Sequence, residues 1–271
     1  MTTMSDARLP RARKRFGQHF LEPAWVTRVI NSLAASAGDA FLEIGPGRGA
    51  LTRPLAAIVH RVIAVEIDRD LAARLTHELP PHVRIVEGDF LDLDLDSILA
   101  GEGCPIRVVG NLPYNVSSPI LFRLLQQAAD GQRFSDATLM LQKEVVDRIA
   151  ASPGGGDYGP LAVQVALVAD VERVLTLPPG AFRPPPKVTS AVVRLRFRPP
   201  SVDVGDRDLF ERVVRGVFLQ RRKTLANGLK PVADALGRSA PGLLAAAGID
   251  PRRRPETLTL EEFGRLSRAV L

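Results

Sequence analysis

The stretch FLEIGPGRG, residues 41–49, places an apolar run directly before three closely spaced glycines. Ala40–Ile44 has the composition of a buried strand and residues 50–59 have a helical pattern, so the glycines form the turn between the two. Glycines at such a turn let the backbone approach a ligand and leave the first N–H groups of the helix free. The spacing is G-x-G-x-G and not the dinucleotide-binding G-x-G-x-x-G, so a structural turn explains this stretch equally well.

Strand and helix patterns alternate on both sides of this turn. Short apolar runs predict strands at residues 40–44, 61–66, 83–87, 105–109 and 137–141. Amphipathic patterns predict helices at residues 22–35, 50–59, 69–79, 117–128 and 143–151. Strands that alternate with helices of this length form a parallel sheet covered on both faces. The predicted fold class is therefore α/β with a Rossmann-like, doubly wound core.

The pattern changes after about residue 170. Residues 171–177 and 190–197 alternate in the manner of antiparallel strands, and the proline-rich stretch PPGAFRPPPKV, residues 178–188, lies between them. Pro199 and Pro200 then interrupt the chain, and only helical patterns follow. We therefore expect two domains, the α/β core over residues 1–200 and a smaller, all-helical domain over residues 201–271.

The composition is typical of a globular protein, since 45% of the 271 residues are hydrophobic and 24% are charged. No apolar run is long enough to span a bilayer, and the basic start, MTTMSDARLPRARKRFGQHF, lacks the apolar stretch of a signal peptide. The single cysteine, Cys104, excludes an internal disulfide, and the four histidines show no metal-ligand spacing. We expect a cytoplasmic protein without a membrane segment or a bound metal.

The chain is basic, with a formal net charge of +6, which favours polyanionic partners. Its basic residues also gather in three runs, at residues 11–15, 221–223 and 252–254. A solvated surface explains any one of these runs equally well. Three such runs in a basic chain favour nucleic acid as the partner.

Two acidic residues follow the second and third predicted strands. Glu66 lies 21 positions after Gly45, close to the spacing of ~20 at which an acid binds ribose hydroxyls in dinucleotide-binding folds. Asp89 is placed to accept a hydrogen bond from an adenine amino group, with Phe90 against the ring. In an open α/β sheet the ligand lies across the carboxyl ends of the strands, where all of these residues fall. The pattern indicates an adenosine-containing cofactor and leaves NAD and S-adenosylmethionine both open.

The stretch GNLPYNVSSP, residues 110–119, favours S-adenosylmethionine. Asn111 ends the fourth strand, and its side-chain oxygen can accept one hydrogen of an exocyclic amino group, while the next peptide carbonyls, held by Pro113, accept the other. Tyr114 offers a face on which a flipped base can stack. Two such acceptors aim the nitrogen lone pair of adenine at a sulfonium methyl, so the transfer needs orientation and no strong base. A plain Asn-Pro turn with a core tyrosine explains the proline but not the arrangement.

Taken in order, the motifs of this chain resemble those of a known family. They are KRFGQHFL, LEIGPGRGALT, AVEIDRDL, GNLPYNVSSP, MLQKEV, YGPLAVQV, PPGAFRPPPKV, FLQRRKTLANGLK and GIDPRRRPETLTLEEF. From about Lys14 to the C-terminus the chain closely resembles the bacterial small-subunit ribosomal RNA adenine-N6 dimethyltransferases known from kasugamycin resistance. The erythromycin-resistance rRNA methyltransferases share the core motifs but match less well in AFRPPPKV and QRRKTL.

The resemblance implies S-adenosyl-L-methionine as the cofactor. The FGQHFL segment would fold over it, which makes His19 and Leu21 expected contacts, although the family usually has Asn at the position of His19. The other implied cofactor-binding residues are Gly45 and Gly47 at the methionine part, Glu66 at the ribose, Asp89 and Phe90 at the adenine, and Ile67 and Asn111.

The resemblance also implies the catalytic residues Asn111, Leu112, Pro113, Tyr114 and Phe182. Phe182 would stack on the target adenine opposite Tyr114, but the sequence alone leaves core packing equally open. The family's product is dimethyladenosine at two adjacent adenosines near the 3′ end of small-subunit rRNA, in a pre-small-subunit particle. Phosphate contacts are expected from the helical domain, at Arg221, Arg222, Lys223 and Lys230. We expect the protein to act as a monomer.

Three other functions fit parts of the sequence. A ribosome-assembly factor that binds the small subunit, and whose methylation is secondary, is compatible with the same motifs. A nicotinamide dehydrogenase accounts for the glycine turn and Glu66, but not for NLPY or the basic runs. A DNA adenine methyltransferase also uses an Asn-x-Pro-Tyr corner. The arm before Lys14 has little to bury, so we expect it to be mobile.

Overall fold

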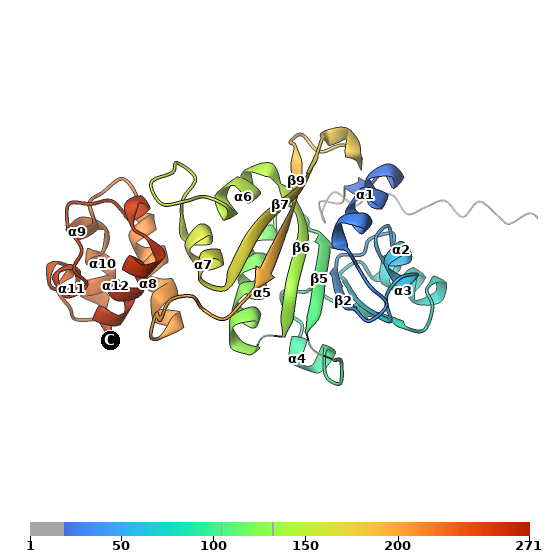
Figure 1. The fold of residues 1–271 in the computed structure, drawn as a ribbon, viewed down its shortest axis with the longest axis horizontal. Coiled ribbons are helices and arrows are strands. Elements are labelled where there is room, and N and C mark those ends of the chain that lie inside the picture. Colours follow the sequence, from blue (N-terminus) through green and yellow to red (C-terminus); the bar gives the residue numbers. More distant parts are fainter. Residues whose placement is uncertain (1–18, 104, 132) are drawn as a thin grey trace, which may run out of the picture. The chain divides into compact units, whose positions relative to one another are not determined.

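A seven-stranded sheet of order β4-β3-β2-β5-β6-β9-β7 forms the centre of the computed structural model, which describes residues 19–271 except Cys104 and Gln132 (Figure 1). The pairs β2–β3, β3–β4, β2–β5 and β5–β6 are parallel. The strands are β2 (Ala40–Ile44), β3 (Arg61–Glu66), β4 (Val83–Glu87), β5 (Ile106–Asn111), β6 (Phe134–Gln142), β7 (Ala169–Leu177) and β9 (Ser190–Phe197). The predicted doubly wound, Rossmann-like core is confirmed.

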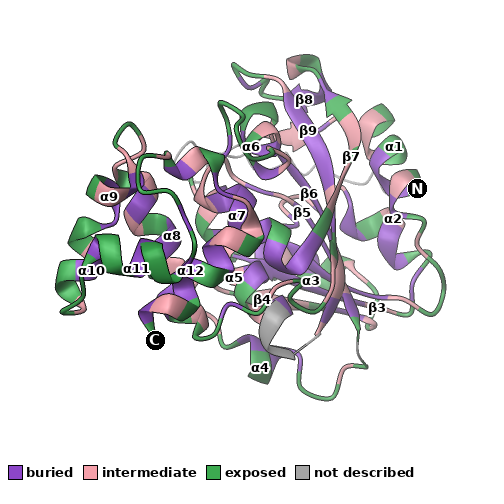
Figure 2. Ribbon diagram, turned by 60° about the vertical axis from the view of Figure 1, so that its left-hand side comes forward, coloured by how far each residue is buried: buried purple, intermediate pink, exposed green. Residues whose placement is uncertain are grey.

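Helices follow most of these strands. They are α1 (Pro23–Leu33), α2 (Thr52–Ala56), α3 (Arg69–Glu78), α4 (Leu95–Ile98), α5 (Ser117–Gly131), α6 (Lys143–Ile149) and α7 (Pro160–Val168). Their starts have ordinary local causes: Pro23 and Pro160 occupy first-turn positions, and the Asp68 side chain caps α3 by accepting a hydrogen bond from the Asp70 amide. The strands are mostly buried, as Figure 2 shows, whereas the exposed residues gather on helices and loops.

Several elements differ from the prediction. The helix predicted over residues 50–59 is limited to α2, because the chain on both sides of it forms turns. No amphipathic pattern indicated α7, whose residues are apolar on every side and almost all buried. Two short strands, β1 (Phe20–Leu21) and β8 (Phe182–Arg183), pair with each other across more than 160 residues of sequence. Such long-range pairs leave no local signal.

The described chain divides into two compact units. The first contains residues 19–123, 133–143 and 173–194, and the second contains Leu124–Gln132, Glu144–Glu172 and Leu195–Leu271. These contact-based units interleave along the chain, and the division into domains at residue 200 stays a prediction. The N-terminal arm and the basic run at residues 11–15 lie outside the described residues. Across the described ranges, no helix has both the length and the apolar character needed to cross a membrane.

The second unit is built around helices. The helices beyond the sheet are α8 (Arg207–Leu219), α9 (Leu225–Gly228), α10 (Lys230–Ala235), α11 (Ala240–Ala246) and α12 (Leu260–Val270). Phe218 of α8 lies between Tyr158, at a ring-centroid distance of 6.1 Å, and Phe263 of α12, at 5.8 Å. Thr259 and Glu262 form a capping box at the start of α12. The prediction that the chain beyond residue 200 is helical is confirmed.

Candidate active site

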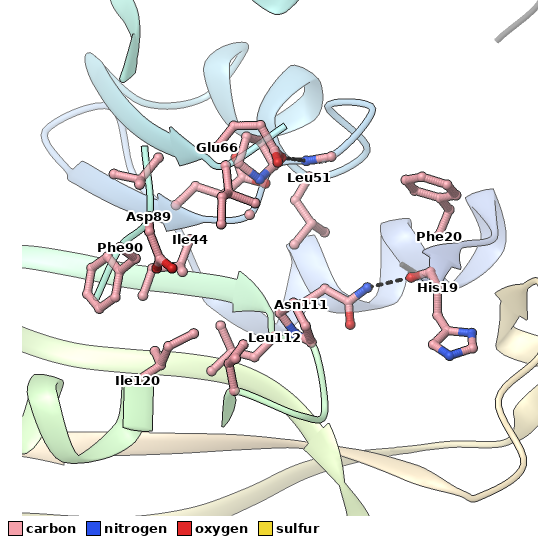
Figure 3. Close-up of a pocket in the computed structure, with 18 of the residues that line it drawn as sticks. His19, Phe20, Ile44, Leu51, Glu66, Asp89, Phe90, Asn111, Leu112 and Ile120 are labelled. Carbon is pink, nitrogen blue, oxygen red and sulfur yellow. Dashed lines mark hydrogen bonds between the residues drawn. The ribbon is translucent and has the colours of Figure 1, made fainter. Parts of the chain in front are cut away.

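A cavity of about 340 Å³ lies in the first unit, at the carboxyl ends of strands β2, β3 and β5 (Figure 3). Its walls contain every cofactor residue that the sequence predicted, together with the NLPY corner: His19, Leu21, Gly45, Gly47, Glu66, Ile67, Asp89, Phe90, Asn111, Leu112, Pro113 and Tyr114. These residues come from five separate segments of the chain. The parallel register of β2 to β5 brings together four of these segments, because the ends of neighbouring parallel strands meet at one edge of a sheet, whereas Leu21 lies in β1, which pairs with β8.

Glu66 and the glycine turn form one wall. The Glu66 carboxylate accepts hydrogen bonds from the Gly47 amide at 2.8 Å and from the Asp68 amide at 2.9 Å, one on each oxygen. Gly45 and Gly47 have φ angles of 70° and 58°, which side chains other than glycine rarely adopt. Burial raises the Glu66 pKa, and the bonds from the backbone amides oppose that rise. The carboxylate is thus oriented, and its remaining lone pairs are suited to accept from hydroxyl groups.

Asp89 and Phe90 form the neighbouring part of the cavity wall, on the loop after β4. The Asp89 carboxylate accepts a hydrogen bond from the Leu91 amide at 2.9 Å, and the Phe90 ring is buried. Arg123 of α5 donates to the carbonyl oxygen of Phe90 at 2.5 Å and to that of Leu93, with its guanidinium 5.4 Å from the Phe90 ring. Arg123 was not predicted from the sequence. Its signal was a single arginine inside the apolar helix ILFRLL.

Asn111 is the last residue of β5, in register with Met140 of β6. Its Nδ2 donates a hydrogen bond of 2.7 Å to the carbonyl oxygen of His19. A carbonyl can only accept, so this bond fixes which end of the amide is nitrogen and leaves Oδ1 as the acceptor. None of the hydrogen bonds among the described residues uses Asn111 Oδ1. The chain therefore presents an oriented amide oxygen at the cavity (Figure 3).

Tyr114 is half-buried beside this amide. Its hydroxyl forms a hydrogen bond of 2.6 Å with Ser190 Oγ, and burial raises its pKa. Its ring is stacked with the His19 imidazole at a centroid distance of 5.5 Å and an interplanar angle of 23°. Leu112, between Asn111 and Pro113, is buried and anchored through its amide to the Met140 carbonyl at 3.2 Å. Asn111, Leu112 and Tyr114 are thus each held by a neighbouring strand or segment.

Phe182 does not line the cavity. It pairs with Leu21 in the β1–β8 ribbon, is only 2% exposed and belongs to a core cluster with Leu21 and Val192. Core packing, the alternative that the sequence left open, describes its position in this structure. Stacking on a target base requires the ring to become uncovered, so that role stays a prediction.

Comparison with known proteins places the chain in a family. A family model for ribosomal RNA adenine dimethylase matches residues 10–264. The chain belongs to the ribosomal RNA adenine dimethylase family. It is similar to ribosomal RNA small subunit methyltransferase A of Pseudomonas aeruginosa, with 46% identity over 97% of this chain and 96% of that protein. The protein of the same name from Geobacter sulfurreducens is 49% identical over 96% of each chain.

Two solved structures share the fold over most of their length. A dimethyladenosine transferase from Plasmodium falciparum has a TM-score of 0.73 and 25% identity, covering 92% of this chain and 96% of that one. The 23S rRNA methyltransferase ErmE has a TM-score of 0.62 and 26% identity, covering 93% of this chain and 99% of that one. The fold is therefore that of a Rossmann-like methyltransferase with a helical C-terminal part.

In this member of the ribosomal RNA adenine dimethylase family, Glu43 also lines the cavity. It was not predicted from the sequence. It lies in β2, within LEIGPG, and is almost completely buried. Its Oε2 has no hydrogen-bond partner. Burial raises its pKa to about 7, and the nearby Glu66 carboxylate adds to the rise. The sequence feature that could have indicated Glu43 is a carboxylate inside an otherwise apolar strand.

The basic residues predicted to bind RNA fall in the second unit and differ in their surroundings. Arg221 is engaged within the protein, since it donates to the carbonyl oxygens of Gly156 at 2.6 Å and Gly155 at 3.3 Å. Arg222, Lys223 and Lys230 are exposed. A surface hollow contains both lysines and is lined by Gln220, Lys223, Asn227, Lys230, Pro231 and Asp234. Among the described residues, no cluster of three or more potential metal ligands occurs.

Proposed function

We propose that this protein transfers methyl groups from S-adenosyl-L-methionine to the N6 atoms of two adjacent adenosines near the 3′ end of small-subunit rRNA. The product would be N6-dimethyladenosine, formed in the cytoplasm by a monomer acting on a pre-small-subunit particle. Family membership supports the reaction class. The observation that carries the proposal is the oriented Asn111 amide, whose free oxygen faces the cavity beside Tyr114.

The cavity suits S-adenosylmethionine, which supplies an electrophilic sulfonium methyl when bound. Glu66 offers an oriented carboxylate to ribose hydroxyls, and Asp89 with Phe90 offers an acceptor and a ring to adenine. A Cβ added at Gly45 would meet no atom within 4 Å, so this turn borders open space in which a ligand can approach the backbone. His19 and Leu21 would cover the cofactor from the N-terminal side.

The NLPY corner would orient the target amino group. Asn111 Oδ1 and the Leu112 carbonyl would accept its two hydrogens, and the Tyr114 ring would stack on the base. This arrangement would favour a pyramidal nitrogen whose lone pair is directed toward the sulfonium methyl. The nitrogen proton becomes acidic only as positive charge develops, so the residues need to position the amine and not to deprotonate it first.

The experiment is transfer of labelled methyl to small ribosomal subunits from a strain that lacks the modification. The rRNA is digested and its nucleosides are identified by mass. We expect dimethyladenosine with the native protein and at least a ~100-fold lower rate with Asn111→Ala, because one preorganised acceptor is removed at the reacting atom. Asn31→Ala, on the exposed side of α1, is the matched amide control. Equal rates for both variants would contradict the role of Asn111.

Two further assays, of subunit maturation and of methyl transfer to duplex DNA, separate the remaining alternatives. If Asn111→Ala fails to methylate yet still supports subunit maturation, the protein also acts as an assembly factor. Methylation of duplex DNA without methylation of subunits would favour a DNA adenine methyltransferase. Membership of a methyltransferase family argues against the nicotinamide dehydrogenase.

A further inference from the structure

His19 contacts both residues that the proposed function assigns to the target base. Its carbonyl oxygen accepts the Asn111 Nδ2 hydrogen bond at 2.7 Å. Its imidazole is stacked with the Tyr114 ring, with 5.5 Å between the centroids and 23° between the planes. The backbone of His19 therefore contacts Asn111 and its side chain contacts Tyr114, the two residues to which the proposed function assigns the adenine.

The stacked pair leaves no room for a base on that face of Tyr114. Aromatic pairs pack with centroids about 4.5–7 Å apart, so a ring inserted between two others requires at least ~9 Å between the outer centroids. The observed distance is 5.5 Å. A base that stacks on this face must displace the imidazole.

The contacts on each ring indicate which of the two moves. Tyr114 is anchored at its edge by the bond of 2.6 Å to Ser190 Oγ of β9, and its neighbour Leu112 is tied to β6. The His19 imidazole is held by an exposed hydrogen bond of 2.7 Å between Nδ1 and the Pro184 carbonyl. Rotation of the His19 side chain breaks that bond and the stacking, yet it leaves the backbone bond to Asn111 in place. The imidazole can therefore leave without disturbing the catalytic amide.

We propose that the His19 imidazole occupies the adenine position on Tyr114 while the site is empty, and that the target base must displace it before methyl transfer. This inference rests on the proposed function. An imidazole suits the role because it is the five-membered ring of a purine, flat and able to stack on the same surface. His19 is then a positioning residue that lowers the apparent affinity for the base, since only the fraction of sites with the ring turned away accepts adenine. A base held in place by RNA contacts elsewhere overcomes this competition.

Two variants separate the ring from the rest of the side chain. His19→Asn removes the ring and keeps a polar group, whereas His19→Phe keeps a ring and removes the bond to Pro184. With small subunits as substrate, we expect His19→Asn to raise kcat/KM about three- to tenfold, because a weak stacking contact and one exposed hydrogen bond no longer compete. His19→Phe should stay at or below the native value. Both variants keep the His19 backbone, through which this inference has the residue cover the cofactor, so the calorimetric affinity for S-adenosylhomocysteine should change less than twofold in each.

Three results would overturn the inference while leaving the proposed function intact. One is an active native enzyme with equal kcat/KM in the Asn and Phe variants. Another is weaker binding of S-adenosylhomocysteine by both variants, which would make the His19 side chain a cofactor contact. The third is a His19 ring signal, in spectra of ¹³C-histidine-labelled protein, that is not shifted upfield in the native protein or that keeps its upfield shift in Tyr114→Leu. A native protein that forms no dimethyladenosine would instead remove the proposed function, and this inference with it.

Discussion

At the residue scale, the buried Glu43 carboxyl links the stability of the fold to pH. Its pKa is about 7 in the folded chain and 4.5 in the unfolded one, so between these values the folded state binds more protons. The contribution of Glu43 to the free energy of unfolding should therefore fall as pH rises from 4.5 to 7, then level off. Glu43→Gln removes this penalty and should be more stable than the native protein at pH 8, by up to ~3 kcal/mol. At pH 5 the two should differ much less.

Urea unfolding of the native and variant proteins at pH 5 and pH 8 measures this difference. Glu144→Gln, which changes an exposed carboxyl on α6, is the control and should give the same difference from the native protein at both values. A Glu43→Gln variant whose advantage does not grow between pH 5 and pH 8 would show that the carboxyl is ionised in the folded state.

The sequence predicted the residues at strand ends better than the partners of their side chains. Glu66, Asp89 and Asn111 could be found because strand periodicity and glycine spacing place them at one edge of a parallel sheet. The buried position of Phe182 could not, because it depends on β8 pairing with the distant β1. Arg221 looked free for the same reason: the carbonyl groups that it binds are more than 60 residues away in the sequence.

At the element scale, the alternation of strands and helices was enough to predict the sheet. Strands β2, β3 and β4 begin and end at the predicted residues, because each is a short apolar run bounded by turns. Helix α7 was not predicted, because burial on all sides removes the amphipathic period on which such predictions depend. The same reasoning explains why α5 was found: it has a polar side and an apolar side.

We expect helix α5 to contribute to cofactor binding as well, through Arg123. This side chain binds the carbonyl oxygens of Phe90 and Leu93 and so holds the loop that carries Asp89. Arg123→Gln should weaken S-adenosylhomocysteine binding about tenfold. The substitution removes two charge-assisted hydrogen bonds that hold the loop with Asp89 and Phe90, the expected adenine contacts. The kcat at saturating cofactor should change little, because the NLPY corner lies on another segment.

Calorimetry with S-adenosylhomocysteine tests this expectation. Arg28→Gln removes an exposed arginine of α1 and serves as the charge-matched control. If Arg123→Gln lowers the thermal midpoint but binds S-adenosylhomocysteine with native affinity, the arginine stabilises the fold and does not contribute to cofactor binding.

At the scale of the whole molecule, the cavity and the exposed cations that we expect to bind RNA belong to different units of the chain. The first unit contains the cavity, whereas Arg222, Lys223 and Lys230 belong to the second. We predict that Lys223 and Lys230, which line one surface hollow, contact rRNA phosphates. Each phosphate contact that a cation makes adds about 0.7–0.9 to the slope of log affinity against log salt. The double variant Lys223→Gln, Lys230→Gln should therefore bind small subunits with a slope smaller by about 1.5.

Binding is measured with purified small subunits between 50 and 200 mM salt, values chosen because phosphate contacts change affinity strongly in this range. The double variant Arg28→Gln, Arg69→Gln loses the same charge from exposed positions of the first unit. If only the lysine variant loses slope, local phosphate contacts account for the salt dependence. Equal losses would mean that the net charge of +6 attracts the RNA without a defined contact at the hollow.

Arg221→Gln should instead lower thermal stability, because its guanidinium holds the 155–156 turn.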